Sequence, residues 1–270
     1  ASTHPSPTSS ASPRPRARTS GATVDSALGM LATLPVKGRA PKTGYSRQQF
    51  GDAWLDVDRN GCDTRNDILR RDLVNKTYKS GTGECVVASG DLPDPYTGRV
   101  ITFHRGQKTS SAVQIDHVIA LSNAWQTGAQ KIPLQQRVAL ANDPLNLLAV
   151  DGPANQQKSD ADAATWLPAN TSFRCAYVAR QVGVKKKYQL WVTLAEKDAM
   201  TRVLRGCPNQ PVPDVANAPI VKAPTGMTKT PATKPRTSKP KTPRNRTTPK
   251  TRHTTKPRPA SGGAYYARCK

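Results

Sequence analysis

The chain has 270 residues, a length that suits one domain, alone or with tails. It carries 41 Lys and Arg against 18 Asp and Glu, for a net charge of +23. This charge favours a polyanionic partner, which is nucleic acid, an anionic cell wall or a lipid surface. No stretch approaches the roughly 18 apolar residues of a membrane-spanning helix, so none is predicted.

Composition predicts four parts along the chain. Residues 1–40 are expected to be largely disordered, although the apolar stretch at 24–34 is suited to packing on the body. Residues 41–207 are expected to form the globular domain. Residues 208–260, rich in Pro, Thr, Lys and Arg, are predicted to be a disordered, extended tether, and residues 261–270 form a short terminal segment.

Within the body, the run Ser46-Arg-Gln-Gln49 has the form of a capping box. It precedes Phe50, Ala53 and Trp54 at helical spacing, which predicts a first helix. The other predicted elements are, in chain order, a helix over 66–73, strands over 98–103 and 114–118, a helix from Pro133 to about 141, a buried strand over 145–150, and two helices over about 172–182 and 190–204.

The five cysteines show no CxxC spacing, which argues against a structural zinc site. Four lie in the body and allow three disulfide connectivities. We favour Cys62–Cys85 and Cys175–Cys207, because each closes a local loop. Cys269 has no obvious partner in the chain.

The first residue is Ala1 rather than Met, and no apolar leader is present. Together with the cysteines, this predicts a processed protein that is secreted and lies outside the cell. The alternative is a cytosolic protein whose thiols are reduced.

The most informative stretch is the apolar run 113–121, which contains Asp116 and His117 side by side. A second apolar run contains Asn146, and a turn then leads into a short predicted helix with Asn155. The order of strand, excursion, strand and helix is the one needed to bring these side chains together.

These residue types suit phosphodiester hydrolysis. A neutral imidazole takes a proton from water near neutral pH, so we expect His117 to be the general base. Hard cations prefer oxygen ligands, which indicates Asn155, with help from Asp116, as the ligand of a divalent metal. Asn146 is expected to hydrogen-bond across the loop after the first strand and hold His117, and Lys158 to contact phosphate.

Each of these residues alone has a structural alternative. An Asp-His pair is often a satisfied structural pair, Asn146 suits a turn, Asn155 suits a helix cap, and Lys158 suits solvent. The ordered set carries more weight than any of its members.

The chain also resembles a known family in several motifs that fall in the same order. They are the runs Asp116 to Trp125, Asn142 to Val150, Asn155 to Lys158, and Thr165 to Pro168. Over about residues 45–207 the sequence looks like the secreted actinobacterial HNH-type endonucleases of the DUF1524 group.

The resemblance implies an α+β fold with a ββα-metal core embedded in additional helices. By it, His117 is the catalytic His, Asn146 the middle Asn, and Asn155 stands where many HNH proteins carry a second His. An Asn ligand favours Mg²⁺ or Mn²⁺ over a softer ion. The terminal run Ala264 to Cys269 resembles the opening of an Excalibur calcium-binding module without its acidic ligand loop, so we expect no calcium there.

Two further phosphate contacts are candidates. The run Asp63-Thr-Arg-Asn66 also resembles the family, and the guanidinium of Arg65 suits a phosphate clamp, with an internal ion pair as its alternative. His104, in Thr-Phe-His-Arg, is either a surface residue or a phosphate contact.

A calcium site is a candidate in the run Asp56-Val-Asp-Arg-Asn-Gly61, which matches the start of an EF-hand loop. Its ligands would be Asp56, Asp58 and Asn60. The twelfth position is Asp67, where that loop requires the longer Glu. The alternative is a turn held by Asx hydrogen bonds.

The sequence thus favours a secreted, metal-dependent endonuclease that cleaves DNA, and RNA as a second substrate, with little sequence specificity, because no base-reading module is present. The alternative is a non-catalytic protein that binds nucleic acid or an anionic cell wall through the tether. A third interpretation, a thiol hydrolase built on Cys175 and His117, is disfavoured by the expected disulfides.

Overall fold

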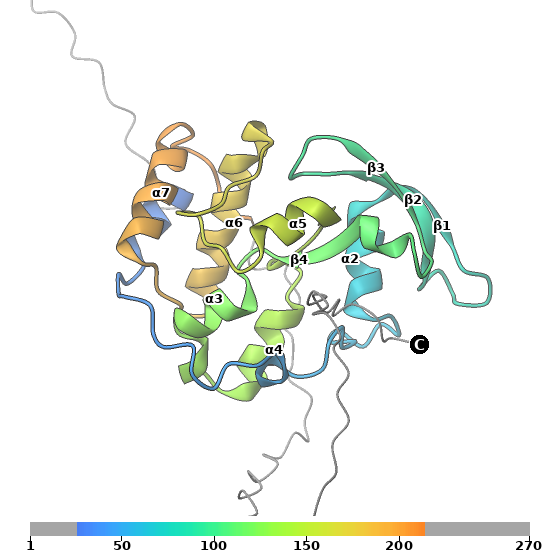
Figure 1. Cartoon of the computed structure of the whole chain (residues 1–270), viewed down its shortest axis with the longest axis horizontal. Coiled ribbons are helices and arrows are strands. Elements are labelled where there is room, and N and C mark those ends of the chain that lie inside the picture. Colours follow the sequence, from blue (N-terminus) through green and yellow to red (C-terminus); the bar gives the residue numbers. More distant parts are fainter. Residues whose placement is uncertain (1–25, 214–270) are drawn as a thin grey trace, which may run out of the picture. The chain divides into compact units, whose positions relative to one another are not determined.

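The computed structural model describes residues 26–213, which form an α+β fold around two antiparallel sheets (Figure 1). One sheet has the order β1-β2-β3, with bounds Val74–Tyr78, Val87–Pro93 and Val100–His104. The other is a two-stranded ribbon of β4 (Val113–His117) and β5 (Leu147–Asp151). The predicted α+β class is confirmed.

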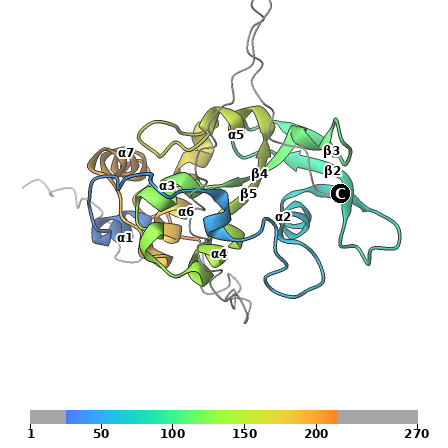
Figure 2. The ribbon, with the colours of Figure 1, turned by 60° about the horizontal axis from the view of Figure 1, so that its bottom comes forward.

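The helices lie on both sides of the ribbon. Helix α2 lies between the ribbon and the three-stranded sheet, whereas α1, α6 and α7 lie on the opposite side (Figure 2). Within residues 26–213 no helix has the length and apolar character needed to cross a membrane. The α-helices are α1 (Ala27–Thr33), α2 (Thr64–Asp72), α3 (Leu121–Gln126), α4 (Leu134–Asn142), α5 (Gly152–Lys158), α6 (Arg174–Lys187) and α7 (Leu194–Arg205). The 3₁₀ helices are η1 (Arg47–Phe50), η2 (Ser110–Ala112), η3 (Ala129–Lys131) and η4 (Thr171–Phe173).

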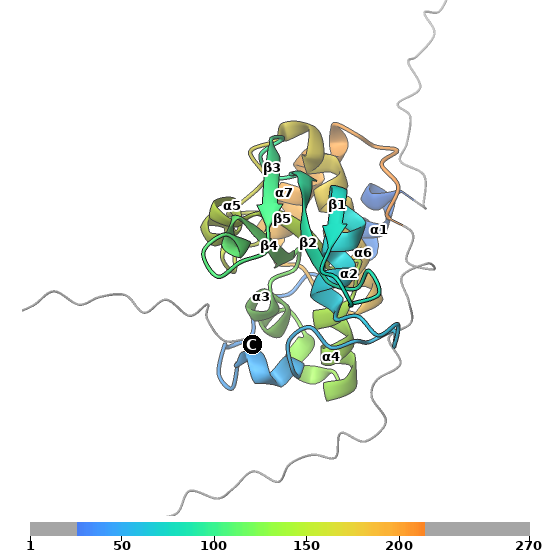
Figure 3. The ribbon, with the colours of Figure 1, turned by 90° about the vertical axis from the view of Figure 1, so that its right-hand side faces the viewer.

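The ribbon separates two apolar cores because successive side chains of a strand point to opposite faces. One core contains α2 and the three-stranded sheet, and the other contains α1, α6 and α7. The first core receives Val113, Ile115, Leu147 and Ala149 from the ribbon, and the second receives Leu148 and Val150. Figure 3 views these layers from the side of the three-stranded sheet, with α6 and α7 lying behind it.

The ribbon and α5 form the strand, strand and helix order predicted from the sequence. His117 pairs with Leu147 at one end of the ribbon, and Val113 pairs with Asp151 at the other. Asp151 also starts α5, because its carboxylate accepts a hydrogen bond from the amide of Ala154 at 2.8 Å. The excursion between the strands contains α3 and α4.

The helix predicted after Ser46 is shorter than expected. Only Arg47–Phe50 is helical, as a 3₁₀ turn, and the Ser46 side chain forms no cap. Gly51 follows with a φ of 78°, a left-handed conformation that ends the helix. A Cβ at this glycine would lie 2.7 Å from the Val138 side chain, so the close approach to α4 also requires glycine.

Residues 26–40 are folded, whereas the segment 1–40 was predicted to be largely disordered. The difference lies in α1, whose Ala27 and Leu31 are fully buried against α6 and α7. The part of the apolar stretch that the structure describes, residues 26–34, therefore packs on the core. Residues 1–25 and 214–270 lie outside the described residues, and with them lie Cys269, the terminal motif and almost all of the predicted tether.

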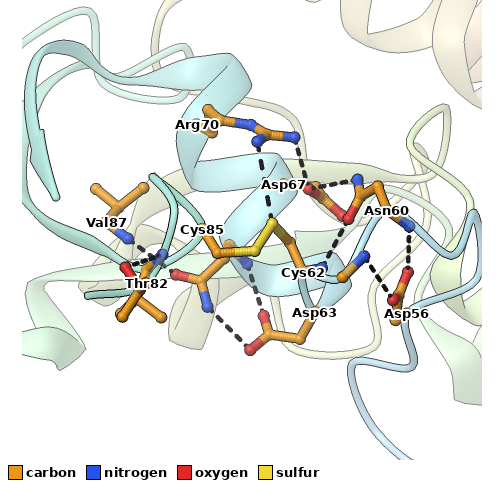
Figure 4. The surroundings of a disulfide bond; sticks show 12 residues. Asp56, Asn60, Cys62, Asp63, Asp67, Arg70, Thr82, Cys85 and Val87 are labelled. Atoms are coloured by element: carbon orange, nitrogen blue, oxygen red, sulfur yellow. Dashed lines mark hydrogen bonds and ion pairs between the residues drawn. A yellow bond between two sulfur atoms is a disulfide. The ribbon is translucent and has the colours of Figure 1, made fainter. Parts of the chain in front are cut away.

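Both predicted disulfides are confirmed. Cys62–Cys85 joins the loop before α2 to the connection between β1 and β2 (Figure 4). Cys175–Cys207 joins the start of α6 to the second residue after α7. Because Cys175 is oxidised, it cannot act as the nucleophile of a thiol hydrolase.

Helices α6 and α7 are joined by an ion pair that is fully buried. The Nζ atom of Lys185 lies 3.1 Å from Oε1 of Glu196, and both side chains have 0% exposure. Lys185 also donates to the carbonyl of Trp191 at 2.9 Å, and Glu196 accepts the amide of Thr193 in a capping box. Such a pair tolerates the loss of one partner poorly, because the other charge is then left uncompensated in the core.

We expect Lys185→Met to destabilise the protein by about 3–5 kcal/mol, because it leaves the Glu196 carboxylate buried and unpaired. Urea denaturation followed by circular dichroism measures the change. The control is Lys186→Met, at an exposed neighbouring position, with an expected change within about 0.5 kcal/mol. Equal losses in the two variants would show that the buried pair contributes nothing specific.

Candidate functional site

The end of β4 presents Asp116 and His117 to different surroundings. Asp116 points towards the core that contains Tyr96, and His117 towards the side that contains Trp54. This follows from the alternation of side chains along a strand. The adjacent Asp and His therefore do not form a hydrogen-bonded pair and have separate structural partners.

His117 has a defined tautomer. Its Nε2 lies 2.8 Å from the carbonyl oxygen of Ala141 at the end of α4. A carbonyl oxygen can only accept, so Nε2 carries the hydrogen and the neutral ring keeps a lone pair on Nδ1. Across residues 26–213 no hydrogen bond to Nδ1 is found. The ring thus has an open acceptor nitrogen and a second nitrogen that is fixed by the backbone.

The imidazole of His117 is neutral at neutral pH. Desolvation by burial lowers its pKa to about 3, and the positive charges of Arg47 and Lys158 act in the same direction. The hydrogen bond to Ala141 opposes this shift without reversing it. The lone pair needed for proton abstraction is therefore present throughout the neutral range.

Asn146 is fully buried and joins three segments. Its Oδ1 accepts the amide of Ile119 at 2.8 Å, and its Nδ2 donates to the carbonyls of Leu140 at 3.2 Å and Ile119 at 3.4 Å. Its own carbonyl accepts the amide of Val118. The side chain therefore ties the loop that follows His117 to the end of α4, which also carries the carbonyl bonded to His117.

Asp116 belongs to a buried polar group. One carboxylate oxygen lies 3.0 Å from Nζ of Lys158, and the other accepts the hydroxyl of Tyr96 at 2.5 Å. Lys158 is 0% exposed and also donates to the carbonyl of His117 at 2.9 Å. Burial raises the pKa of the Asp116 carboxyl, and these two partners act against that rise.

The structure thus places Lys158 inside the protein, whereas the sequence suggested a phosphate contact at the surface. Its ammonium is held between Asp116 and the backbone of β4. In this arrangement the ammonium neutralises a buried carboxylate, and its contact with phosphate stays a prediction.

Asn155 lies on α5, half-buried, beside the start of β4. Its Nδ2 donates to Oε1 of Gln114 at 2.9 Å, and no hydrogen bond to its Oδ1 is found in the described part of the chain. Gln114 and Asp116 lie two residues apart and therefore on the same face of β4. The structure brings Asn155 to the face of Asp116 rather than to that of His117.

The two expected metal ligands do not form an open cation site in this arrangement. Both oxygens of Asp116 are engaged, one of them by an ammonium, and a divalent cation beside Lys158 would experience like-charge repulsion. Only the Oδ1 atom of Asn155 is open. No group of three or more His, Cys, Asp or Glu suited to a metal occurs among residues 26–213.

Arg65 and His104 lie in different places. Arg65, on α2, donates to the carbonyl of Val113 at 3.5 Å, which places its guanidinium at the start of the strand that ends in His117. His104 is exposed at the end of β3 and pairs with Ser89 in the three-stranded sheet. The ribbon therefore contacts Arg65, whereas His104 belongs to the other sheet.

The acidic loop before α2 forms a hydrogen-bonded turn (Figure 4). The Asp56 carboxylate accepts the amides of Asn60 at 3.1 Å and Gly61 at 2.9 Å, and Asp58 accepts the same Asn60 amide at 3.3 Å. Asp67 accepts from the side chains of Asn60 and Arg70 at 3.0 Å. These are the Asx hydrogen bonds of a turn, and calcium binding by Asp56, Asp58 and Asn60 stays a prediction.

Sequence reasoning missed three partners of the central residues. Trp54 stacks on His117, with ring centroids 6.4 Å apart and planes at 15°. Tyr96 is fully buried against Asp116, and the Ala141 carbonyl binds His117. The sequence indicated Trp54 only as an apolar helix residue. It contained no sign of the other two, because a backbone carbonyl and a distant tyrosine leave no local pattern.

Comparison with known proteins places the folded body in a family. Residues 63–203 match the model described as "GmrSD restriction endonucleases, C-terminal domain". An "Uncharacterized secreted protein" of Arthroderma benhamiae is 39% identical over 183 residues, which is 67% of this chain and 84% of that protein. No solved structure matches the chain.

The family match includes His117, Asn146 and Asn155, and it begins after Arg47 and Trp54. The family model covers more than half of the chain, and the relative is matched over most of its own length. The chain therefore belongs to the family of the GmrSD restriction endonuclease C-terminal domain, a family of nucleases.

Proposed function

We propose that the protein is a secreted HNH-type endonuclease that hydrolyses phosphodiester bonds of DNA, and of RNA as a second substrate, with His117 as the general base. The observation that carries the proposal is the hydrogen bond from Nε2 of His117 to the Ala141 carbonyl. This bond fixes the tautomer in which Nδ1 has a lone pair that is open to accept a proton. The family match supports a nuclease, and the high positive charge supports a polyanionic substrate.

In the proposed reaction, Nδ1 of His117 takes a proton from a water molecule whose oxygen attacks phosphorus. The bond from phosphorus to the leaving oxygen then breaks, and the leaving oxygen takes a proton from solvent. The imidazolium that forms still donates from Nε2 to Ala141. A bound phosphate favours this imidazolium, because a nearby negative charge opposes the desolvation that lowers the pKa of His117 in the free protein.

Asn146 is assigned the role of a positioning residue. It holds the loop after His117 and the end of α4 together through its amide, so its contribution is to keep the imidazole and its carbonyl partner at hydrogen-bonding distance. A group fixed in this way loses little freedom when the substrate binds. Asn155 lies at the other face of the ribbon, with an open amide oxygen.

The divalent cation, Mg²⁺ or Mn²⁺, stays a prediction of the sequence. Asn155 is the candidate ligand of this cation. Asp116 can become a second ligand only if the ammonium of Lys158 moves away from its carboxylate. Such a cation would supply charge neutralisation at the phosphate. The proton transfer proposed for His117 does not depend on the cation. Removal of the cation by a chelator tests whether cleavage needs it.

Export is proposed on two observations. Both disulfides of the folded body suit an oxidising compartment, and the fungal relative is named a secreted protein. The proposed contact with an anionic cell wall would be made by residues 208–260, nearly all of them outside the described residues.

We expect His117→Ala to lower the rate of plasmid nicking by a factor of roughly 10² to 10⁴, because the variant lacks the proton acceptor. The rate is measured on an agarose gel from the conversion of supercoiled plasmid by the purified protein. In a parallel gel-shift assay we expect the variant still to bind DNA. Undiminished nicking by the variant would place the base elsewhere, and His104→Ala would then be compared. Binding without nicking by the wild type would make the protein a non-catalytic binder.

We expect EDTA to stop nicking, and Mg²⁺ or Mn²⁺ in excess over the chelator to restore it, because the sequence predicts a cation that stabilises phosphate charge. The same gel measures all three conditions. Nicking that continues after dialysis against EDTA would contradict the predicted cofactor and leave the role of His117 intact.

The lowered pKa of His117 predicts that its contribution to stability depends on pH. Between about 3 and 6.5 the unfolded chain binds a proton at this residue that the folded protein does not, so stability falls as pH falls through that window. We expect His117→Gln to lose less stability than the wild type between pH 6.5 and 4. Urea midpoints measured at several pH values test this, and parallel curves for the two proteins would contradict it.

A further inference from the structure

The segment Tyr45–Leu55 lies outside the family match, yet it is packed on the element that holds His117. Phe50 is buried in the core that contains Leu140 and Ala141 of α4. Arg137 of α4 donates to the carbonyl of Gln49 at 2.6 Å. Ala141, on the same helix, provides the carbonyl bonded to the candidate base. The segment is therefore fixed relative to that base.

The same segment reaches the ring of His117 itself. Trp54 stacks on the imidazole and does so from a left-handed backbone with a φ of 61°. Bulky residues rarely adopt that conformation, so the surrounding structure must hold it in place. Beyond it lies the hydrogen-bonded turn of Asp56, which Cys62 ties to Cys85. The segment thus borders the His117 site at one end and is anchored on both sides of the ring.

Arg47, in the same segment, carries a charge that no partner neutralises. Its side chain is exposed, and within residues 26–213 it makes no hydrogen bond or ion pair. Two guanidinium groups that contact the ribbon are already engaged, Arg71 with Asp72 and the carbonyl of Leu147, and Arg65 with the carbonyl of Val113. Arg47 belongs to η1, which packs on α4, and α4 carries the Ala141 carbonyl that is bonded to His117.

We propose that Arg47 binds a phosphate of the nucleic-acid backbone beside His117 and makes the segment Tyr45–Leu55 a substrate-binding wall of the site. The inference rests on the proposed function, which supplies the substrate. An exposed guanidinium with its donors open matches two oxygens of one phosphate in a fork geometry. The contact reads the backbone and no base, so it supplies affinity without sequence specificity.

The test measures binding separately from cutting. His117→Ala serves as the background, so that the DNA stays intact, and Arg47→Gln is added to it. Fluorescence anisotropy with a labelled DNA duplex gives the affinity over a series of salt concentrations. We expect affinity to fall about tenfold, because a charge-assisted contact is lost. We also expect the slope of log affinity against log salt to decrease by about one unit, as for the loss of one phosphate contact.

The matched control is Arg202→Gln in the same background. Arg202 is exposed on α7 and makes no ion pair among the described residues. Its replacement by Gln removes the same charge from a helix that packs on α1 and α6. Its expected effect on affinity is less than about twofold, because a distant surface charge is screened by salt. Arg47→Lys keeps the charge without the fork and should fall between the wild type and Arg47→Gln.

The outcomes separate this inference from the proposed function. Equal losses of affinity for Arg47→Gln and Arg202→Gln would overturn the phosphate contact, and nicking that depends on His117 would then still support the nuclease. A specific loss at Arg47 would support the contact. If the affinity falls specifically in Arg47→Gln but the wild-type protein never nicks DNA, the phosphate contact is supported and the proposed hydrolysis is overturned. Melting temperatures equal to that of the background show that the variants are folded.

Discussion

The hydrogen bond between His117 and the Ala141 carbonyl is the interaction on which the candidate site depends. It decides which imidazole nitrogen carries the hydrogen, and it joins the end of β4 to the end of α4. The amide of Asn146 fastens the same two segments a few residues away. Because both bonds end on α4, any element that packs on this helix is also positioned relative to His117, and η1 is such an element. A single helix therefore connects the catalytic candidate, its positioning residue and the wall that carries Arg47.

The two faces of the ribbon divide the chemistry of the site. On one face the imidazole is kept neutral by burial and by positive charge. On the other, Asp116 is neutralised by Lys158 and bonded to Tyr96, in a setting where an unpaired carboxylate would be costly. The ammonium of Lys158 also contacts the backbone of His117 and so joins the two faces. A cation that used Asp116 as a ligand would have to replace this ammonium, and cation binding would then be coupled to the packing of α5.

The sequence predicted the parts of this site that have local causes. The apolar runs around His117 and Asn146 are long enough to indicate buried strands, and both are present as β4 and β5. The strands β1 and β2 were not predicted, because β1 is mostly exposed and its pairing with β2 is irregular. Such a strand shows no alternation of apolar and polar residues in the sequence. It is stabilised by its pairing with the neighbouring strand. The burial of Lys158 was missed for a related reason, since its partners lie about 40 residues earlier in the chain.

Trp54 shows how a correct local pattern led to a wrong local structure. Its spacing from Phe50 suits a helix, but Gly51 ends the turn and the chain continues with left-handed backbone at the tryptophan. The tertiary contact with His117 offsets a backbone cost of order 1–3 kcal/mol, which no local preference would predict. His117, Ala141 and Asn146 lie inside the residues that match the family model, whereas Trp54 and Arg47 lie outside them. The match therefore covers the candidate base and its backbone partner but not the segment that is proposed to contact phosphate.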